Sequence, residues 1–387
     1  MIPYGKQDIS EADIQAVVDV LHSDWITQGP AIEQFEHAVA TYCGAKYAVA
    51  VCNATAALHL ACLAAGLGTG DSLWTSPNSF VASANCGLYC GATVDFVDID
   101  PHTYNMSVPL LEKKLQDAAL KNQLPKIVVP VHFAGQSCDM EAIHQLAKHY
   151  HFTVIEDASH AVGGSYLDQK IGSCAFSDMT VFSFHPVKLI TTGEGGMVVT
   201  HSKTLYDTLI RLRSHGITRQ ADEMTEPAHG PWYYQQIELG FNYRMTDIQA
   251  ALGKSQLTRL DAFIARRHEL AFRYREAFQD LPLTMQQQQP DRYSAYHLFV
   301  IRLQLEELKK SRLEIFNELR ESGIGVNVHY IPIHTQPYYQ KMGFKKGDFP
   351  ESERYYEAAI SLPMYAGILD EEQERVIKNV KDSLYFG

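Results

Sequence analysis

Short apolar runs alternate with helical patterns over residues 46–151 of this 387-residue chain, and no other feature limits its possible folds as much. Four pairs of a strand-like run and a helix-like stretch follow one another, from "KYAVAVCN" with "ATAALHLACLAAGLG" to "KIVVPVHFAG" with "DMEAIHQLAKHYH". Because a parallel strand reaches its neighbour only through a crossover, this order is typical of βαβ units. The sequence therefore predicts an α/β layer with a largely parallel sheet.

The next three strand-like runs, "FTVIEDASHA", "DMTVFSFHP" and "GGMVVTH", have no helix of crossover length between them, so this end of the sheet is predicted to be mixed. A long helical pattern then runs from about Asp247 to Asp280, and the polar "QQQQPDRYS" after it resembles a connection. Beyond it, "AYHLFVIRL", "SRLEIFNELRESG" and "GVNVHYIPI" indicate a smaller unit. We expect a large α/β domain with a mixed, mostly parallel sheet over residues 1–255 and a smaller C-terminal α+β domain over residues 256–387.

Composition and charge exclude several classes of protein. The formal net charge of −12 and the isoelectric point of about 5.8 argue against a nucleic-acid surface, because phosphate binding depends on clustered Lys and Arg. No run is apolar enough to span a bilayer, and the N-terminal residues resemble neither a signal peptide nor a transit peptide. We therefore expect no nucleic-acid partner, no membrane association and a cytoplasmic location.

The cysteines point to the same compartment. There are seven of them, an odd number, scattered through apolar segments, which predicts reduced thiols. Cys86 and Cys90 are four residues apart, but no second Cys or His pair completes a zinc site, so we expect no metal.

The stretch "VFSFHPVKLITTGEGGMVVT" places one lysine, Lys188, between two strongly β-prone runs. Open α/β sheets bind ligands beyond the carboxyl ends of their strands, which is where Lys188 is predicted to lie. Most loop lysines are merely solvated, but two other stretches favour a function. "IEDASHA" places Asp157 at the end of an apolar strand, and "CNATAALHLA" places small polar residues at the start of a helix.

These three features together match the requirements of pyridoxal phosphate. The aldehyde of this cofactor needs a lysine amine that loses its proton readily, and Lys188 is the candidate. Its pyridine nitrogen stays protonated only beside a carboxylate, a role that fits Asp157. Its phosphate prefers the exposed N–H groups and positive dipole of a helix N-terminus, where Thr55 and Ala56 are the expected donors.

Each of these residues also has an interpretation without a ligand. Asp157 could begin an Asx turn, and Asn53 or Thr55 could be an ordinary helix cap. The glycines of "TTGEGG" do not form G-x-G-x-x-G and precede a strand, so a dinucleotide site is a poor interpretation. We expect them to form a tight turn after the lysine.

Motifs along nearly the whole chain, from "IPYGKQDI" to "SLPMY", resemble those of the DegT-type nucleotide-sugar aminotransferases, which use pyridoxal phosphate and have fold type I. They include "SDWITQGP", "TSPNSFVASANCGLYCGATVDFVDID", "VPVHFAG", "SFHPVKLITTGEGG", "RSHGITR", "LGFNYRMTDIQAALG" and "VNVHYIPIHTQPYY". Within the family they are most similar to the branch that serves pseudaminic acid biosynthesis. The resemblance implies transfer of the amino group of glutamate to C4 of a UDP-linked 4-keto-6-deoxy-N-acetylhexosamine.

The same resemblance implies roles for individual residues. Lys188 would form the Schiff base, and Asp157 would contact the pyridinium. Further cofactor contacts are implied for Ser183 at the phosphate, Phe80 on the ring face, His160 beside the ring hydroxyl, and Asn242 at the phosphate of the partner subunit. The last of these makes a homodimer with shared active sites the expected unit. For the nucleotide-sugar site, the resemblance points to Tyr4, Ile26, Thr27, Gln28, Gly29, His329 and Tyr330.

Three rival functions stay open on this basis. A related branch performs sugar 3-dehydration, but its pattern has His where this chain has Lys188, which disfavours it. A sibling aminotransferase acting on another 4-keto sugar, such as a perosamine or aminoarabinose precursor, is compatible with the sequence. A regulatory protein that retains the fold is disfavoured by the intact Lys188 and Asp157 and by the lack of a basic DNA-reading segment.

Overall fold

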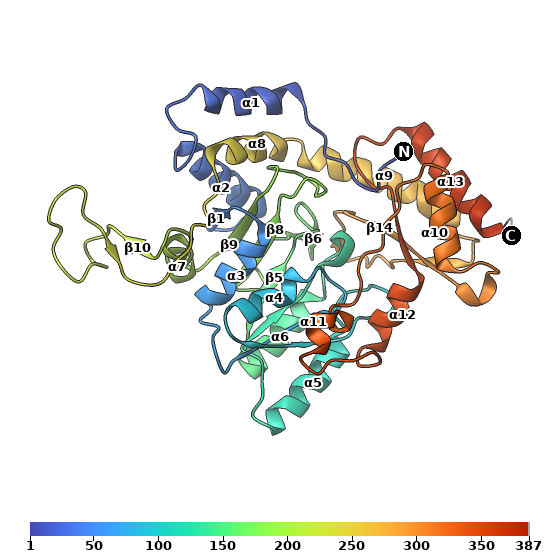
Figure 1. Cartoon of the computed structure of the whole chain (residues 1–387), viewed down its shortest axis with the longest axis horizontal. Coiled ribbons are helices and arrows are strands. Elements are labelled where there is room, and N and C mark those ends of the chain that lie inside the picture. The colour runs from blue at the N-terminus through green and yellow to red at the C-terminus, as the bar shows by residue number, and fades with distance from the viewer. Residues whose placement is uncertain (386–387) are drawn as a thin grey trace.

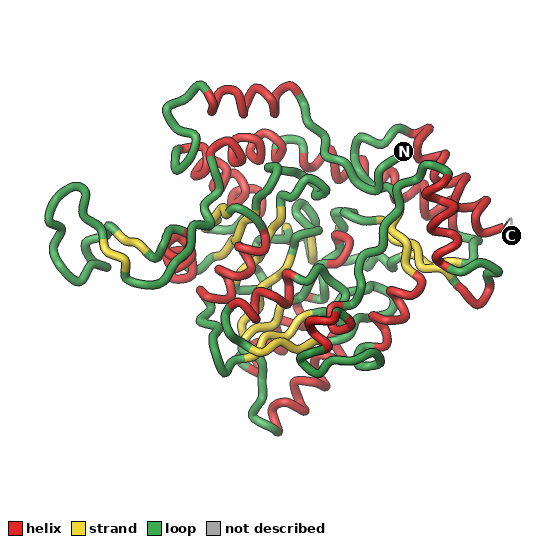
Figure 2. The backbone as a smooth tube through the Cα atoms, in the orientation of Figure 1, coloured by secondary structure: helices red, strands yellow, loops and turns green. Residues whose placement is uncertain are grey.

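A seven-stranded sheet forms the centre of the computed structural model, which describes residues 1–385. Its order is β1-β9-β8-β5-β4-β2-β3, visible as the central yellow strands in Figure 2. Strands β8, β5, β4, β2 and β3 run parallel, whereas β9 is antiparallel to both neighbours, β1 and β8. The predicted mixed, mostly parallel sheet is confirmed. The strands are β1 (Tyr47–Val51), β2 (Ser72–Thr75), β3 (Thr93–Phe96), β4 (Ile127–Val129), β5 (Thr153–Asp157), β8 (Met179–Ser183) and β9 (Gly196–Thr200).

The four predicted pairs of strand and helix are all present, with α3, α4, α5 and α6 following β1, β2, β3 and β4. Local sequence explains where these helices begin. For example, the Asn53 side chain accepts a hydrogen bond from Ala56 N and caps α3. The helices of this part are α1 (Glu11–Leu21), α2 (Pro30–Cys43), α3 (Ala54–Ala64), α4 (Ala82–Tyr89), α5 (Val108–Leu120), α6 (Met140–Tyr150), α7 (Lys203–Arg213) and α8 (Asp247–Leu257).

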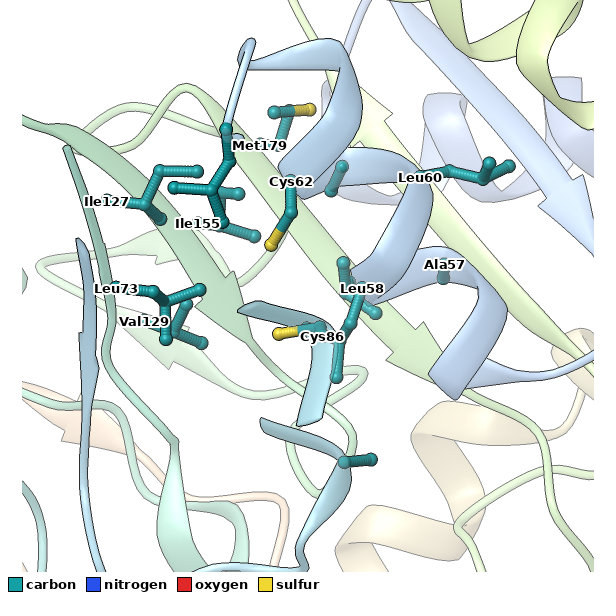
Figure 3. Close-up of a cluster of buried hydrophobic side chains, with 14 of the residues drawn as sticks. Ala57, Leu58, Leu60, Cys62, Leu73, Cys86, Ile127, Val129, Ile155 and Met179 are labelled. Carbon is teal, nitrogen blue, oxygen red and sulfur yellow. The ribbon is translucent and has the colours of Figure 1, made fainter. Parts of the chain in front are cut away.

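Helix α3 is buried against the sheet because nearly all of its residues are small or apolar. Figure 3 shows its Cys62 close to the strand residues Ile155 and Met179, and its Leu58 close to Cys86 of α4, within one hydrophobic cluster. The start of α3 approaches β9 so closely that a Cβ on Gly196 would lie 2.5 Å from the carbonyl carbon of Asn53. Only glycine allows this approach, which brings the helix N-terminus to the strand ends.

The prediction of one long helix between Asp247 and Asp280 is wrong, because the structure has two helices there. Helix α8 ends at Leu257, and α9 runs from Leu260 to Phe278. At the break, Arg259 has φ −105° and ψ 0°, and its guanidinium binds Asp8 and Asp13, each at 2.5 Å. The ion pairs tie the break to the N-terminal segment and α1. The helical pattern is continuous in sequence, so only this tertiary contact reveals the break.

The C-terminal part is built on a three-stranded antiparallel sheet in the order β12-β14-β15. Ile2 forms a parallel bridge with Ile324, so the first residues of the chain also pack here, and Figure 1 shows both termini on this side. The elements are α9, β12 (Leu283–Met285), β14 (Phe299–Leu303), α10 (Arg312–Glu321), α11 (Pro337–Gln340), α12 (Pro350–Ala358), β15 (Ala359–Leu362) and α13 (Asp370–Tyr385). The division at residues 255 and 256 stays a prediction.

Two small sheets complete the fold. One joins β13 (Arg292–Tyr293), β6 (Ser165–Tyr166) and β7 (Gln169–Lys170), so the polar "QQQQPDRYS" stretch packs on the large part instead of forming a free linker. Within it, the Gln286 amide donates to the carbonyl of Thr103 at 2.7 Å. The other pairs β10 (Ile217–Thr218) with β11 (Gln235–Gln236) in an arm that projects to the left in Figure 1. Within residues 1–385, no helix has the length and hydropathy needed to cross a membrane.

Candidate active site

A cavity of about 620 Å³ lies at the carboxyl ends of β5 and β8, beside the start of α3. Its lining comes from the beginnings of α3 and α4, the last residues of β5 and β8 with the turns that follow, and the irregular segment 327–330. The predicted site residues that line it are Tyr4, Thr55, Phe80, Asp157, His160, Ser183, Lys188, His329 and Tyr330. The fold thus brings most of the predicted residues into one cavity.

Lys188 lies in a turn shortly after β8, where its backbone N–H donates to the carbonyl of His185 at 2.9 Å. Its side chain is partly exposed and faces the cavity. Burial among protein atoms lowers the pKa of the Lys188 amine to about 8, and the negative charge of Asp157 opposes this shift. A larger fraction of the amine is therefore unprotonated near neutral pH, which is the form that attacks a carbonyl group.

Asp157 is the last residue of β5 and only 4% of its surface is exposed. Its Oδ2 accepts a hydrogen bond from the Ser83 hydroxyl at 2.6 Å, and its Oδ1 accepts one from Ser159 N at 3.1 Å. The second contact is the Asx-type turn considered from the sequence, and it leaves the contact of Asp157 with a cofactor as a prediction. Two donors hold the carboxylate in one orientation toward the cavity.

The start of α3 offers unoccupied N–H groups. The Asn53 carboxamide oxygen accepts from Ala56 N at 2.8 Å, so Asn53 is a helix cap and the N–H of Ala56 is already used. Among the described residues, no hydrogen bond to the N–H groups of Ala54 and Thr55 is found, and both residues line the cavity. The Ser183 hydroxyl faces the same space. Together they form a site for an anion at a helix N-terminus.

His160 and Tyr330 line the cavity together and contact each other through their side chains. The His160 Nε2 lies 3.1 Å from the Tyr330 hydroxyl. Burial, assisted by the positive charge of Lys188 and by His329, holds the pKa of His160 well below its usual value, so the ring is neutral at physiological pH. Phe80 also borders the cavity, is 57% exposed, and lies 6.4 Å from the Tyr330 ring centre. A flat ligand entering the cavity would therefore meet an accessible aromatic face.

Tyr4 and His329 come from opposite ends of the chain and meet with ring centres 5.3 Å apart. His329 Nδ1 lies 2.8 Å from the Ser361 hydroxyl, and its Nε2 lies 3.4 Å from the Asn327 amide nitrogen. Burial lowers the pKa of His329 to about 4, and nearby Lys188 adds to this shift. This end of the cavity is consequently uncharged and aromatic at neutral pH.

Some predicted residues lie outside the cavity of their own chain. Asn242 is exposed and forms an isolated bridge with Ser214. The segment of Ile26, Thr27, Gln28 and Gly29 is held by Asp247, whose Oδ2 accepts from Gly29 N at 2.8 Å. Ala56 is buried behind the lining of the cavity. For these positions the predicted ligand contacts stay predictions.

Other cavity residues were missed by sequence reasoning. The strongest is Ser83, which lies in α4 and fixes Asp157. It belongs to the motif "TSPNSFVASANCGLYCGATVDFVDID", but nothing in that motif singles it out. His185 and Glu194 flank Lys188 within the glycine-rich stretch and could have been found from their closeness to it. Asn327 lies two residues before His329 in the motif "VNVHYIPIHTQPYY" and could have been found from that closeness. His297 had no signal, since its approach to the cavity depends on tertiary packing.

Comparison with known proteins decides the family. The chain matches the DegT/DnrJ/EryC1/StrS aminotransferase family over residues 7–381. It belongs to this family. The resemblance predicted from the sequence is confirmed, and the chain is an aminotransferase of the DegT type.

Relatives and solved structures of the DegT family match along nearly the full length. The spore coat polysaccharide biosynthesis protein SpsC of Bacillus subtilis is 42% identical, covering 98% of this chain and 96% of its own. The UDP-4-amino-4,6-dideoxy-N-acetyl-beta-L-altrosamine transaminase of Campylobacter jejuni is 37% identical, and the match covers 100% of this chain and 97% of that protein. Helicobacter pylori PseC, an aminotransferase of pseudaminic acid biosynthesis, superposes with a TM-score of 0.91 at 32% identity, covering all of both chains.

DegT-family aminotransferases use pyridoxal phosphate, which is the cofactor predicted from the sequence. A solved PLP form of the Streptococcus pneumoniae protein Spr1654 matches with a TM-score of 0.88 and 31% identity, covering 99% of this chain and 98% of its own. The cavity fits this group. It combines the amine of Lys188, the carboxylate of Asp157 and the unoccupied N–H groups of Ala54 and Thr55. When bound, the cofactor supplies a ring that withdraws electrons from the reacting carbon.

Proposed function

We propose that this chain transfers the amino group of glutamate to C4 of a UDP-linked 4-keto-6-deoxy-N-acetylhexosamine in pseudaminic acid (nonulosonate) biosynthesis. The observation that carries the proposal is the full-length similarity to the Campylobacter transaminase and to PseC, two proteins named for this chemistry. A cytoplasmic location is part of the proposal, because all seven cysteines are unpaired.

Two residues would manage the proton and the charge during the reaction. Lys188, with a pKa lowered to about 8, is suited to accept a proton from the amino donor and to give it back during the reaction. Asp157, oriented by Ser83 and Ser159, would keep the proton on the ring nitrogen.

The aromatic end of the cavity would orient the sugar. Tyr4, His329 and Tyr330 surround this end and carry no net charge at neutral pH, so they suit a sugar ring better than a free carboxylate. Holding the 4-keto carbon near Lys188 would supply much of the rate through orientation.

The direct test is a substrate panel. Purified protein loaded with cofactor is incubated with isotope-labelled glutamate and with UDP-, GDP- and dTDP-linked 4-keto sugars, and the products are identified by mass spectrometry. We expect the label in a UDP-linked 4-amino sugar together with an equal amount of 2-oxoglutarate. Turnover of only GDP- or dTDP-linked sugars would contradict the substrate assignment while leaving the aminotransferase reaction intact.

A second candidate is a sibling reaction on another nucleotide 4-keto sugar. The specific observation in its favour is that SpsC, named for spore coat polysaccharide, is 42% identical, compared with 37% for the Campylobacter transaminase. The same panel separates the two, because perosamine and aminoarabinose precursors differ from the proposed substrate in the sugar.

We also propose that the working unit is a homodimer in which Asn242 reaches the cofactor phosphate of the partner subunit. Two observations support this. Asn242 is exposed and does not line the cavity of its own chain. The nearby arm carries Trp232 and Leu239, whose surfaces are 73% and 79% exposed, as is common for residues that a partner covers.

Mixing two impaired variants tests the shared site. In a mixed dimer of Lys188→Ala and Asn242→Ala subunits, one site receives both changes and the other receives neither. We expect activity to reappear on mixing, provided that subunit exchange is demonstrated and that Asn242→Ala alone is impaired. Absence of recovery under demonstrated exchange would mean that Asn242 serves its own subunit.

A further inference from the structure

Arg267 on α9 carries a buried charge that is not paired with an acid. Only 2% of its surface is exposed, and within residues 1–385 no carboxylate is found at ion-pair distance from it. Burial lowers the pKa of the guanidinium to about 10, which leaves it charged at neutral pH. A buried charge without a counter-charge is unfavourable for folding, so its position demands a specific explanation.

The guanidinium binds backbone carbonyls from two separate segments. Its Nη1 donates to Tyr296 O at 3.0 Å, to His297 O at 3.3 Å and to Met364 O at 2.8 Å. Residues 296–297 lead into β14, and residue 364 follows β15, which pairs with β14. Arg267 therefore joins the two chain segments that leave one end of this strand pair.

Each of these segments supports part of the cavity lining. His297 lines the cavity directly, and its ring centre lies 4.4 Å from that of His160. Met364 N donates to the carbonyl of Tyr4 at 2.9 Å, and Tyr4 also lines the cavity. One guanidinium is thus linked to two residues of the cavity lining, of which Tyr4 lies at the end where the sugar is proposed to bind and His297 lies beside His160.

The backbone at Tyr296 is strained, since its φ of +45° lies in the left-handed region that non-glycine residues rarely adopt. Contacts on both sides maintain it. Ala295 N donates to Gly135 O at 2.9 Å, and the Tyr296 carbonyl accepts from Arg267. This strained turn immediately precedes His297, so the contact with Arg267 helps to fix where the imidazole points.

The imidazole of His297 is itself incompletely bonded. Only 4% of the residue is exposed, and its Nδ1 has no hydrogen-bond partner among the described residues. Burial and the nearby His160 and Lys188 hold its pKa well below the usual value, so it is neutral. The unpartnered Nδ1 is itself buried, so what His297 presents to the cavity is the rest of an uncharged ring, which suits contact with a neutral ligand group better than pairing with an anion.

We propose that Arg267 is a positioning residue that holds His297 and Tyr4 in place to receive the nucleotide sugar. The inference rests on the proposed function, because it assigns this end of the cavity to the sugar. It adds a residue that touches neither substrate nor cofactor and acts only through backbone carbonyls.

Arg267→Met tests the proposal, since methionine retains much of the apolar bulk but removes the donors. Arg273→Met is the matched control, because Arg273 is on the same helix, more exposed and paired with Asp370 on the surface. We expect the KM for the nucleotide sugar to rise about tenfold in Arg267→Met only, with the rate of cofactor amination by glutamate within about threefold of wild type. Arg267→Lys should recover part of the loss.

Amide hydrogen exchange without substrate supplies a readout that does not depend on the sugar. We expect faster exchange confined to residues 294–298 and 364–365 in Arg267→Met, with an unfolding midpoint close to that of Arg273→Met. Unchanged exchange and KM, or faster exchange throughout the chain, would overturn the proposal. If Arg267→Met does not fold, the same measurements on Arg267→Lys decide, and unchanged values there overturn it as well.

The two proposals can fail separately. If wild type aminates none of the offered nucleotide sugars, the proposed function fails. In that case, exchange in residues 294–298 still shows whether Arg267 holds this segment, and unchanged exchange overturns the positioning role.

Discussion

The cavity has two sides that are built in different ways. The sheet side consists of Asp157, Ser183, Lys188 and the start of α3, all at or near the ends of buried strands. The segment side consists of Tyr4, His297 and residues 327–330, which belong to no long helix or strand. The first side is held by regular backbone pairing and the second by individual hydrogen bonds.

The pairing shows how firmly the sheet side is held. Asp157 pairs in register with Val181, and its N–H donates to Pro130 O at 2.9 Å, so the backbones on both sides fix it. On the segment side, Tyr330 N reaches the Asn78 side chain at 3.4 Å, a longer contact. We infer that changes on the sheet side affect the chemical step, whereas changes on the segment side affect substrate binding.

Lys188→Ala should have the largest effect. Removing the amine removes both the attachment point of the cofactor and the group that moves the proton, so we expect kcat to fall by roughly a thousandfold or more. Borohydride should attach the cofactor covalently to Lys188 in wild type and not in the variant. The exposed Lys113→Ala serves as control. Turnover of Lys188→Ala at the wild-type rate would show that another residue carries the chemistry.

Asp157→Asn should come second. A neutral amide cannot hold a proton on the ring nitrogen, although it can keep the hydrogen bond with Ser83, so cofactor should still bind. We expect kcat to fall by about a hundredfold, with KM changed little. Asp117→Asn, on the exposed face of α5, is the control. Near-normal kcat would place a different group at the nitrogen.

Tyr330→Phe tests the segment side and should have a smaller effect, on the KM for the nucleotide sugar and not on kcat. It removes the hydroxyl that contacts His160 Nε2 and keeps the ring. Without this contact Tyr330 and His160 are held less firmly on the cavity lining. We expect about a fivefold rise in the KM for the nucleotide sugar, which corresponds to about 1 kcal/mol of binding. We expect kcat to change by less than about threefold. A large fall in kcat with an unchanged KM would remove the distinction between the two sides.

Lys188→Met in the cofactor-free protein should change stability instead of activity, and the change should depend on pH. Burial lowers the pKa of Lys188 from 10.5 to about 8, so the protonated amine destabilises the folded state below pH 8. As pH rises from 8 to 10.5, the folded chain releases the proton before the unfolded chain does, and this destabilisation fades. The variant should therefore be more stable than wild type near neutral pH, with the difference shrinking above pH 8. Urea unfolding across this range measures it, and a difference independent of pH would contradict the lowered pKa.

Several parts of the site could be predicted from the sequence. Lys188, Asp157 and the start of α3 each have a local pattern, because a strand end or a helix start is encoded by a few adjacent residues. The Asn53 cap shows the limit of such patterns. The same sequence predicted a phosphate donor at Ala56, whose N–H is bonded to the cap in the structure, so this assignment stays a prediction.

The sequence by itself determined the order of strands and helices and, through the family motifs, the cofactor and the aminotransferase reaction. Only the tertiary structure decided the break at Arg259, the contact of Ser83 with Asp157, and the meeting of Tyr4 with His329. The physical reason is the distance along the chain over which each kind of interaction acts. Periodicity and capping act over a few residues, whereas these contacts join residues far apart in the chain, whose approach depends on the packing of the whole fold.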